Sequence, residues 1–574
     1  MMPYRKFAFP LNVYARAIEL EEGHVDYLHY GLFRTPDEPF DSAQRHSTEL
    51  LIEHLPPSPA HILEVGIGLG KTAGLLSGLG YRITGITPDP AQITEARRRA
   101  GDAELSCVRW EEYEADKGQF DAVLFQESSQ YVEPLVLLGK SCALLKTGGC
   151  LVMLDEFAMK RTEPGAEGLH LLQHMAAQAG RFGFRLEKHL DLSSHAAPTL
   201  DYLLNVVKKH CKRLEADLDL DDAGLDALNA SNEAYRKKYE EGRFGYALLV
   251  FRKTAEPLWQ LRTMTPSDRP AVFELFRQAF GHDMPASLWE WKYGPSNASD
   301  VNAWRDGRLA GHYGGLERAV LFFGKPEKAV QIGDVMVHPS ERGVLRRKGV
   351  FHQMAASFFE CNVGYGRPCL ASFGFPNERV MRLGEKLGLY GEIDRIVEAS
   401  WTPLDPGISP FVKVRLLHAD SPLLQENVET LWKEMAAGFR EGIMGVRDWA
   451  YFRHRYFLHP CRRYKVYLAS SRIGSRPRGI FVLQKKGDEW ELMDLVCPLH
   501  EIPLLVRHAR RMTGSLGGKK LTCWMTSAIS KYFGRRLELR DIGIPIATNL
   551  SLFGPGLEKM RERWWLMGGD TDFL

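Results

Sequence analysis

The stretch His-Ile-Leu-Glu-Val-Gly-Ile-Gly-Leu-Gly at His61–Gly70 decides the fold of the first part of this chain. A short apolar run ends in an acid, and glycine then occupies every second position. This pattern predicts a buried strand that passes through a tight turn into a helix. Because glycine lacks a Cβ atom, the backbone of such a turn can approach a ligand closely.

Strand and helix patterns alternate beyond this turn. Helical patterns at 92–99 and 135–145 separate some of the apolar runs that predict strands. Those runs lie at 81–87, 105–110, 120–126 and 150–154. Alternating units of this kind imply an α/β fold with a parallel, doubly wound sheet, whose ligands bind at the carboxyl ends of the strands.

Three motifs in this region carry a family resemblance. They are Glu64-Val-Gly-x-Gly-x-Gly70, Phe120-Asp-Ala-Val123 and Lys146-Thr-Gly-Gly149. Together they resemble the class I S-adenosylmethionine-dependent methyltransferases over residues 20–253. The resemblance implies a Rossmann-like sheet, methyltransferase activity and S-adenosylmethionine as cofactor.

A nicotinamide-binding Rossmann domain is the alternative for this region. It would need G-x-G-x-x-G and an acid that closes the second strand. The chain instead has glycines at every second position and Thr87 after that strand.

Thr87 also departs from most methyltransferases, which place an acid there. The stretch Ile86–Gln92 is similar to the cyclopropane-synthase-like branch, in which a Thr and a downstream Gln share the ribose hydroxyls. Gln92 could also be an ordinary helix-surface residue. The resemblance places Trp110 and Glu111 around the adenine and Glu64 beneath the methionine end. The expected cofactor-binding set is Glu64, Gly66, Gly68, Gly70, Thr87, Gln92, Trp110, Glu111 and Gln126.

The acceptor side of this site is expected in two segments. Gly23–Phe33 is rich in aromatic residues, and in similar methyltransferases the segment before the first strand folds over the cofactor. Tyr27, His29 and Tyr30 are therefore pocket candidates, with His29 a candidate catalytic residue; the alternative is that these rings seal the sheet edge.

The second segment, Gln126–Tyr131, follows the fourth strand. Glu127 and Tyr131 match substrate-facing positions of the cyclopropane-synthase-like branch, which usually has His in place of Tyr131, so lipid chemistry is not implied. Methyl transfer needs in-line positioning and sometimes a base. Glu127 is the first candidate base and the pair Asp155-Glu156 the second, against the alternative of satisfied loop carboxylates. A charged helical stretch over 195–242 predicts a lid.

A different pattern begins after a linker at 253–257. A predicted strand at Gln331–Pro339 runs through a basic turn into a helix at 352–360. This resembles the GNAT acyltransferase superfamily, with Arg346-x-x-Gly349-x-Phe351 in place of R-x-x-G-x-G/A. Backbone N–H groups at a helix N-terminus form a nest for the pyrophosphate of coenzyme A, although an ordinary basic turn is the alternative. The resemblance assigns acetyl-CoA or another acyl-CoA to Met336, Val337, Arg342, Arg346, Arg347, Lys348, Gly349, Val350, Phe351 and Asn377.

The catalytic groups of this GNAT-like domain are less clear in the sequence. Many members place a tyrosine seven residues after the equivalent of Asn377, as general acid to the departing thiolate. The chain has Gly384 there, and Tyr390 is nearby but out of register. Another acid or solvent would then protonate the thiolate. Alternatively, the domain binds acyl-CoA without catalysis, or it carries out a related reaction such as decarboxylation. Asp334 is the candidate base, and a backbone N–H of the same strand is expected to hold the oxyanion.

Residues 411–574 echo the GNAT-like domain. Trp289 and Asp334 have the same separation as Trp449 and Asp494, and the flanking patterns agree. We expect a second, degenerate GNAT-like unit, although one shared spacing could be coincidence. No glycine nest follows Pro498, so this copy is expected to lack coenzyme A and to pair with the first. The expected domains are 1–253, 258–402 and 411–574.

Composition narrows the functional classes. Lys plus Arg is 74 against 72 for Asp plus Glu, so net charge gives no case for nucleic acid. Nine scattered cysteines without a C-x-x-C pair argue against a zinc site or a disulfide framework. No apolar run suits a signal peptide or a membrane span. We expect a cytoplasmic enzyme without metal, nucleic-acid or membrane partners; a homodimer stays open.

The expected function combines both resemblances. The chain would be a bifunctional enzyme that methylates and acylates a small polar metabolite, such as a natural-product or amino-sugar intermediate. One alternative is a methyltransferase with a decarboxylating GNAT-like module of polyketide-loading type. Another is a methyltransferase whose GNAT-like module only binds acyl-CoA.

Overall fold

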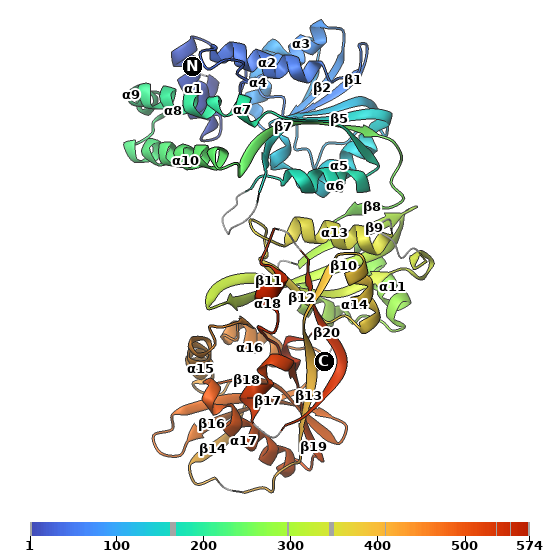
Figure 1. Cartoon of the computed structure of the whole chain (residues 1–574), viewed down its shortest axis with the longest axis vertical. Helices are drawn as coiled ribbons and strands as arrows, with labels where there is room; N and C mark the ends of the chain where they lie inside the picture. The colour runs from blue at the N-terminus through green and yellow to red at the C-terminus, as the bar shows by residue number, and fades with distance from the viewer. Residues whose placement is uncertain are drawn as a thin grey trace. The chain divides into compact units, whose positions relative to one another are not determined.

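The computed structural model describes residues 3–160, 168–294, 298–343, 349–407, 409–534, 537–550 and 553–571. These residues form two compact units, Met1–Arg262 and Thr263–Leu574. Figure 1 shows the helices and strands of each unit. Both units consist of helices packed on sheets, so the predicted α/β class is confirmed.

The first unit is built on a seven-stranded sheet of order β3-β2-β1-β4-β5-β7-β6. Strands β1 to β5 are parallel, and β7 runs antiparallel to both of its neighbours. The strands are β1 (His61–Val65), β2 (Arg82–Thr87), β3 (Glu104–Cys107), β4 (Phe120–Gln126), β5 (Leu145–Ala158), β6 (Phe184–Asp191) and β7 (Phe244–Lys253). The strand order reverses between β1 and β4, and ligands bind at such a switch point in doubly wound sheets.

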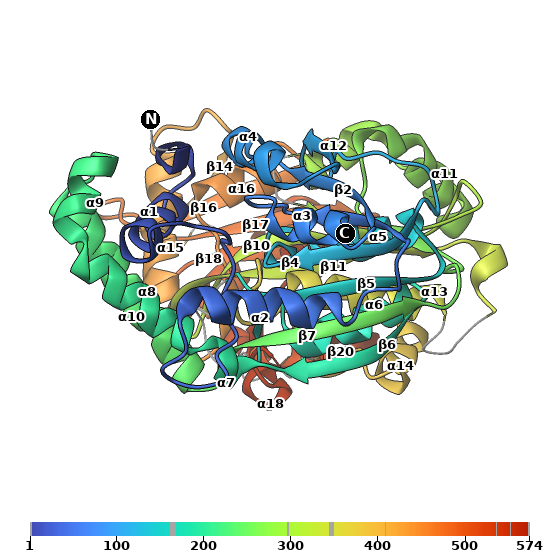
Figure 2. The ribbon, with the colours of Figure 1, turned by 90° about the horizontal axis from the view of Figure 1, so that it is seen from above.

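Helices complete the first unit. The helices between strands are α3 (Lys71–Gly78), α4 (Pro90–Arg99), α5 (Pro134–Leu144) and α6 (Leu172–Arg181), and α2 (Phe40–Ile52) precedes the sheet. The predicted helical insertion consists of α7 (Ser193–Ala196), α8 (Pro198–Lys209), α9 (Cys211–Leu218) and α10 (Asp222–Glu240). Figures 1 and 2 show α8, α9 and α10 grouped with α1 (Leu11–Glu22), and α1 packs against α8 and α9.

The second unit contains two halves that share an order of two helices, three strands, a helix and two further strands, with β14 added at the start of the second half and α14 added in the first. The first half comprises α11 (Arg269–Phe280), α12 (Ala286–Tyr293), β9 (Ala298–Arg305), β10 (Arg308–Phe322), β11 (Lys325–Val337), α13 (Val350–Asn362), β12 (Ala371–Gly374), α14 (Glu378–Lys386) and β13 (Tyr390–Trp401). The second comprises β14 (Val412–Leu417), α15 (Leu424–Gly438), α16 (Trp449–Tyr456), β16 (Tyr464–Ser471), β17 (Pro477–Lys486), β18 (Glu489–Val496), α17 (Ile502–Ser515), β19 (Lys520–Thr526) and β20 (Glu538–Asn549). In each half an antiparallel group of strands is followed by a helix and one parallel strand.

The two halves exchange their last strands. Strand β13 of the first half pairs with β19 of the second, and β20 of the second pairs with β12 of the first. Because β13 and β20 also pair with each other, both halves belong to one continuous sheet. Neither half therefore completes its own sheet.

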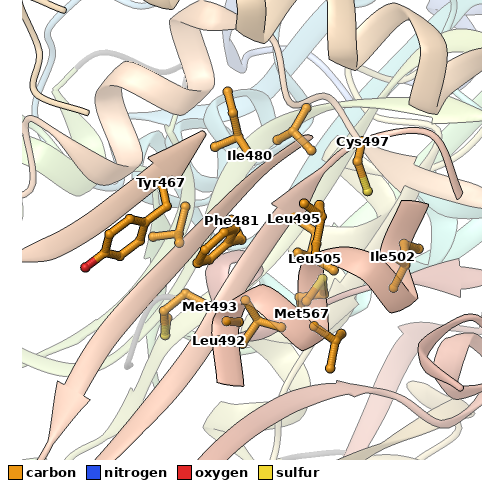
Figure 3. Close-up of a cluster of buried hydrophobic side chains, with 14 of the residues drawn as sticks. Tyr467, Ile480, Phe481, Leu492, Met493, Leu495, Cys497, Ile502, Leu505 and Met567 are labelled. Atoms are coloured by element: carbon orange, nitrogen blue, oxygen red, sulfur yellow. The ribbon is translucent and has the colours of Figure 1, made fainter. Parts of the chain in front are cut away.

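The core of the second half lies between its sheet and α17. Figure 3 shows side chains of β17 and β18 packed against Ile502 and Leu505 of that helix. These side chains are fully buried or nearly so, including Phe481, Leu492 and Leu495. This half is thus an ordinarily packed α/β layer.

Packing around α14 explains why position 384 is glycine and not the tyrosine of many GNAT members. A Cβ atom on Gly384 would lie 2.1 Å from Cδ2 of Tyr390. The ring of Tyr390, at the start of β13, therefore fills the space that a side chain at position 384 would need. Its hydroxyl forms a 2.8 Å hydrogen bond with that of Tyr313, and both residues are buried.

Replacing Gly384 with alanine is expected to lower the free energy of unfolding of the second unit by about 1–3 kcal/mol, because the Cβ would overpack against Tyr390. Gly180→Ala in α6 is the control: its added Cβ meets no heavy atom within 4 Å. That variant should be neutral or gain up to about 1 kcal/mol, since alanine favours helix. Chemical denaturation measures both; a neutral Gly384→Ala variant would contradict this packing.

Candidate active sites

The three glycines after β1 have positive φ angles, and the space around them differs. Their φ angles are 80° at Gly66, 54° at Gly68 and 78° at Gly70. A Cβ on Gly66 would lie 2.5 Å from Cβ of Ser128, and one on Gly70 would lie 2.8 Å from Cα of Ala96. At Gly68 the nearest atom would be 3.8 Å away. Packing thus explains Gly66 and Gly70, whereas Gly68 leaves room for a ligand.

Buried polar atoms without partners surround this turn. Among the described residues, Glu64 Oε2, Gln126 Nε2 and Trp110 Nε1 are buried and have no hydrogen-bond partner. Burial of the Glu64 side chain raises the pKa of its carboxyl to about 8. Unsatisfied buried groups are uncommon in native proteins, because each costs free energy. Their concentration at the ends of β1 and β4 fits a polar, partly cationic ligand.

The structure brings Thr87 and Gln92 into contact. The hydroxyl of Thr87 donates to Oε1 of Gln92 at 2.9 Å. The side chain of Asp89 accepts from the N–H of Ala91 at 2.7 Å and so caps α4. The cap holds the first turn of α4, and Gln92 with it, beside the end of β2. Ribose binding by this pair stays a prediction.

Trp110 and Glu111 lie in different environments. Trp110 is 3% exposed, packs edge-on against Phe125 and has Lys140 above its ring. The side chain of Glu111 is exposed and lies 3.6 Å from that of Arg109. The strand expected to carry Trp110 ends at Cys107, where pairing with β2 stops. Placement of both residues around the adenine stays a prediction.

A group of buried carboxyls and tyrosines lies at the ends of β4 and β5. Oε1 of Glu127 accepts from the backbone N–H of Tyr30 at 2.5 Å and from the hydroxyl of Tyr246 at 2.7 Å. Oε1 of Glu156 accepts from the hydroxyl of Tyr239 at 2.5 Å. The rings of Tyr30 and Tyr246 stack with centroids 5.8 Å apart. We call Tyr30, Glu127, Glu156, Tyr239 and Tyr246 the tyrosine–carboxyl cluster.

Five parts of the first unit assemble this cluster. Tyr30 comes from the segment before the sheet, Tyr239 from α10 and Tyr246 from β7, while the acids follow β4 or end β5. The aromatic segment and the helical insertion therefore meet at the sheet ends. Sequence reasoning missed Tyr239 and Tyr246, which are far from Glu127 in the chain.

The protonation of the cluster changes the role predicted for Glu127. Burial, together with the charge of Glu156, raises the pKa of Glu127 well above its usual range. Burial also raises the pKa of Asp155 to about 6 and that of Glu156 to about 7. Burial therefore favours the protonated form of Glu127, which opposes its predicted role as a base. Of the candidate acids, Glu156 titrates closest to neutrality.

The other predicted catalytic residues of this unit are less suited to proton transfer. His29 Nδ1 donates to the carbonyl of Tyr30 at 2.9 Å, and its Nε2 lies 3.2 Å from the hydroxyl of Thr48. Both ring nitrogens are occupied, and burial lowers the pKa of His29 to about 4. Tyr27 is buried beside His29. Tyr131 is 79% exposed and does not join the buried cluster.

In the second unit, β11 separates from its parallel neighbour. Pairing between β11 and β12 runs from Ala329 to Ile332 and stops, although β11 continues to Val337. On its other side, Asp334 and Val335 oppose the single residue Tyr313 of β10, which is a β-bulge. Asp334 has a φ of 49°. The split and the bulge free backbone N–H groups of β11 for a ligand.

The predicted acyl-CoA residues lie along this strand and the following turn. Met336 is buried, and Arg342 is exposed with Nε donating to the carbonyl of Val337 at 3.0 Å. Gly349 is the buried N-cap of α13, and Val350 begins the helix. Phe351 packs against Tyr313 and Tyr390. Arg346, Arg347 and Lys348 lie outside the described residues.

The side chains of Asn377 and Asp334 both make hydrogen bonds within the protein. Asn377 caps α14, with Oδ1 accepting from the N–H of Val380 at 3.0 Å. Oδ2 of Asp334 accepts from Nζ of Lys292 and from the hydroxyl of Tyr293, both at 2.5 Å. These two contacts already engage the carboxylate, which makes Asp334 a poor general base.

In the second half, a buried ion-pair network occupies the position equivalent to Asp334. Asp494 lies at the equivalent place in β18, again beside a register shift. Its Oδ1 accepts from Nε of Arg447 at 2.9 Å, and Arg447 also reaches Asp570 at 2.6 Å. Arg447 and Asp494 are fully buried. The charges of Arg447, Asp494 and Asp570 are therefore paired with one another within this half.

Family models match both units. Residues 63–153 match a methyltransferase domain, and residues 260–375 match an acetyltransferase (GNAT) domain. The chain carries a methyltransferase domain and a GNAT acetyltransferase domain. Both predicted resemblances are therefore confirmed.

Individual relatives resemble the methyltransferase domain. A ubiquinone biosynthesis O-methyltransferase from Methylocella silvestris is 39% identical over 95 residues, which are 16% of this chain and 37% of that enzyme. A cyclopropane synthase from Mycobacterium tuberculosis is 16% identical with a TM-score of 0.35, covering 44% of this chain and 93% of the other. A geranyl diphosphate C-methyltransferase from Streptomyces coelicolor A3(2) is 17% identical with a TM-score of 0.33, covering 44% of this chain and 98% of the other.

Within the described parts of the chain, no helix is long and apolar enough to span a membrane.

The buried carboxyl of Glu64 predicts a pH-dependent stability difference. The folded protein holds this proton more tightly than the unfolded chain does, so its contribution is lost as pH rises from the ordinary value of 4.5 to about 8. Over that window, wild type should lose about 1.4 kcal/mol per pH unit relative to Glu64→Gln. Denaturant unfolding of both proteins at several pH values measures this; a constant difference would contradict a raised Glu64 pKa.

Proposed function

We propose that the chain is a bifunctional enzyme that transfers a methyl group from S-adenosylmethionine and an acyl group from acetyl-CoA or a similar thioester. The acceptor is a small polar metabolite, such as a natural-product or amino-sugar intermediate. One observation supports the proposal: in each unit, strand pairing ends where the expected cofactor would bind. In the first unit, unpaired buried atoms surround Gly68; in the second, a split and bulged strand leads to Gly349.

The residues of the first turn fit S-adenosylmethionine. Glu64 places an unpaired carboxyl oxygen where a positive charge would lower its raised pKa. Thr87 and Gln92 present a linked hydroxyl and amide to the ribose. The open side of Gly68 admits the ligand close to the backbone. When bound, S-adenosylmethionine supplies an electrophilic methyl group.

The tyrosine–carboxyl cluster would form the acceptor wall of this site. The hydroxyls of Tyr239 and Tyr246 donate to Glu156 and Glu127, so the cluster offers their oxygen atoms as acceptors to a polar substrate. Stacked rings of Tyr30 and Tyr246 exclude water. Glu156, whose pKa is about 7, is the group placed to take a proton at neutral pH.

The residues of the second turn fit an acyl-CoA. The N-terminus of α13 directs backbone N–H groups at the position where a pyrophosphate would lie. The split between β11 and β12 receives the thioester arm, and the bulge at Asp334 and Val335 offers an N–H to the carbonyl oxygen. When bound, acyl-CoA supplies an activated acyl group.

A second candidate is a methyltransferase whose GNAT domain binds acyl-CoA without transferring the acyl group, or decarboxylates it. Gly384 favours this alternative, because the tyrosine that many members use as general acid is absent. Tyr390 occupies the corresponding space but is hydrogen-bonded to Tyr313.

Calorimetric titration with S-adenosylhomocysteine tests the first site. Gly68→Ala places a methyl group on the open side of the turn and is expected to weaken binding by about tenfold or more, or 1.4 kcal/mol. Gly148→Ala is the matched control, since Gly148 also has a positive φ, of 83°, and open space beside it, but lies in the turn before Cys150. Both variants carry similar backbone strain; equal affinities for the ligand would contradict the assignment.

Titration with acetyl-CoA tests the second site. Gly349→Glu adds a negative charge at the N-terminus of α13 and is expected to abolish acetyl-CoA binding while leaving S-adenosylhomocysteine binding unchanged. If wild type binds only S-adenosylhomocysteine, the bifunctional proposal fails and a methyltransferase alone remains.

A further inference from the structure

We propose that His312 is the general base of the GNAT domain and removes the proton from the acyl acceptor. This inference rests on the proposed acyl transfer and names a residue for it. His312 lies on β10 and is 1% exposed. Among the described residues its Nε2 has no hydrogen-bond partner.

A chain of hydrogen bonds fixes the tautomer of His312. Asp300 Oδ1 accepts from the backbone N–H of Met264 at 2.7 Å and from Nδ2 of Asn302 at 2.5 Å. The amide of Asn302 therefore turns its carbonyl oxygen toward His312, whose Nδ1 lies 2.8 Å away. A carbonyl oxygen only accepts, so Nδ1 carries the proton. Nε2 then has a free lone pair, which is the form a general base needs.

The free nitrogen faces the bulge of β11. A Cβ on Gly314 would lie 2.8 Å from Nε2 of His312 and 3.3 Å from the hydroxyl of Tyr293. Gly314 pairs with Gly333, the residue before Asp334, so neither strand places a side chain there. Nε2 thus points at the part of β11 where the thioester carbonyl is expected. A nucleophile there reaches Nε2 directly or through one water.

The surroundings keep His312 neutral. Burial lowers the pKa of His312 below its usual range. The charged groups that face it are Asp300 from β9 and Asp334 from β11, which raise the pKa, and Lys292 from α12, which lowers it. A neutral imidazole at physiological pH is ready to accept a proton.

The second half lacks this arrangement. His312 pairs with Met336, two residues after Asp334; in the second half Ile480 pairs with Val496, two residues after Asp494. The equivalent side chain is therefore apolar. The base is confined to the half that matches the acetyltransferase model.

The acceptor nitrogen or oxygen forms a bond to the thioester carbonyl carbon, and its proton passes to Nε2 of His312. The carbon–sulfur bond breaks, and the proton then passes from Nε2, through water, to the leaving thiolate, which leaves His312 neutral again. The products are the acylated acceptor and free coenzyme A.

The test uses the full chain, acetyl-CoA and a panel of small primary amines, with thiol release as readout. His312→Gln is expected to bind acetyl-CoA within twofold of wild type by calorimetry but to lose about 100-fold or more in kcat. His418→Gln, an exposed position in β14–α15, is the matched control and should keep full activity. A His312→Gln variant with kcat within threefold of wild type would overturn the inference.

Two further readouts separate a base from a structural histidine. In wild type, kcat/KM should be flat through neutral pH and fall only in acid, and His312→Gln should lose this acid limb. Nitrogen NMR of histidine-labelled wild type should show His312 protonated at Nδ1; a proton on Nε2 would overturn the inference without any activity measurement. Wild type that releases no thiol with any amine refutes the proposed acyl transfer instead, and the base assignment falls with it.

Discussion

Strand pairing stops at both candidate sites, and the groups freed there have to find other partners. In the first unit, β1 and β4 end side by side where the strand order reverses. In the second, β11 leaves β12 and bulges away from β10. Backbone and side-chain polar groups buried at such ends cost free energy unless something binds them. A ligand that supplies those partners removes this cost, and that gain favours its binding.

Burial then sets the chemistry of each site. Glu64, Glu127 and Glu156 all have raised pKa values because their carboxyls are removed from water. His312 has a lowered pKa for the same reason. One physical cause therefore raises the pKa of acids near the methyltransferase turn and lowers the pKa of a histidine in the acetyltransferase domain. Hydrogen bonds donated by Tyr239 and Tyr246 to the acids, and by His312 to Asn302, decide which atoms remain available.

The sequence predicted the parts of the molecule that local patterns control. The glycine turn and the alternation of strands and helices that makes a doubly wound sheet depend on residues close in the chain. Long-range assembly was not predictable in the same way. Tyr246 meets Glu127 across 119 residues, and nothing in the spacing marks that pair. The sequence favours Glu127 as the base, whereas its burial and the nearby Glu156 appear only in the structure. Trp110 lies beyond the strand expected to carry it, because β3 ends at Cys107.

The internal repeat shows both the reach and the limit of pattern reasoning. Matching positions of Trp289 and Trp449 indicated two similar halves, and the order of elements repeats. The exchange of β13 and β20 could not be predicted, because either strand would fit the edge of either half. Likewise, Asp334 resembled a base from its place in the strand, whereas its contacts with Lys292 and Tyr293 and the free nitrogen of His312 appear only in three dimensions.

Hydrogen exchange of the full chain, measured peptide by peptide with each ligand, tests most directly whether two separate cofactor sites exist. S-Adenosylhomocysteine should slow exchange in peptides that cover 63–72, 86–92 and 124–128. Acetyl-CoA should slow exchange in peptides that cover 332–354 and leave the first set unchanged. Protection of the same peptides by both ligands, or of neither set, would contradict the account.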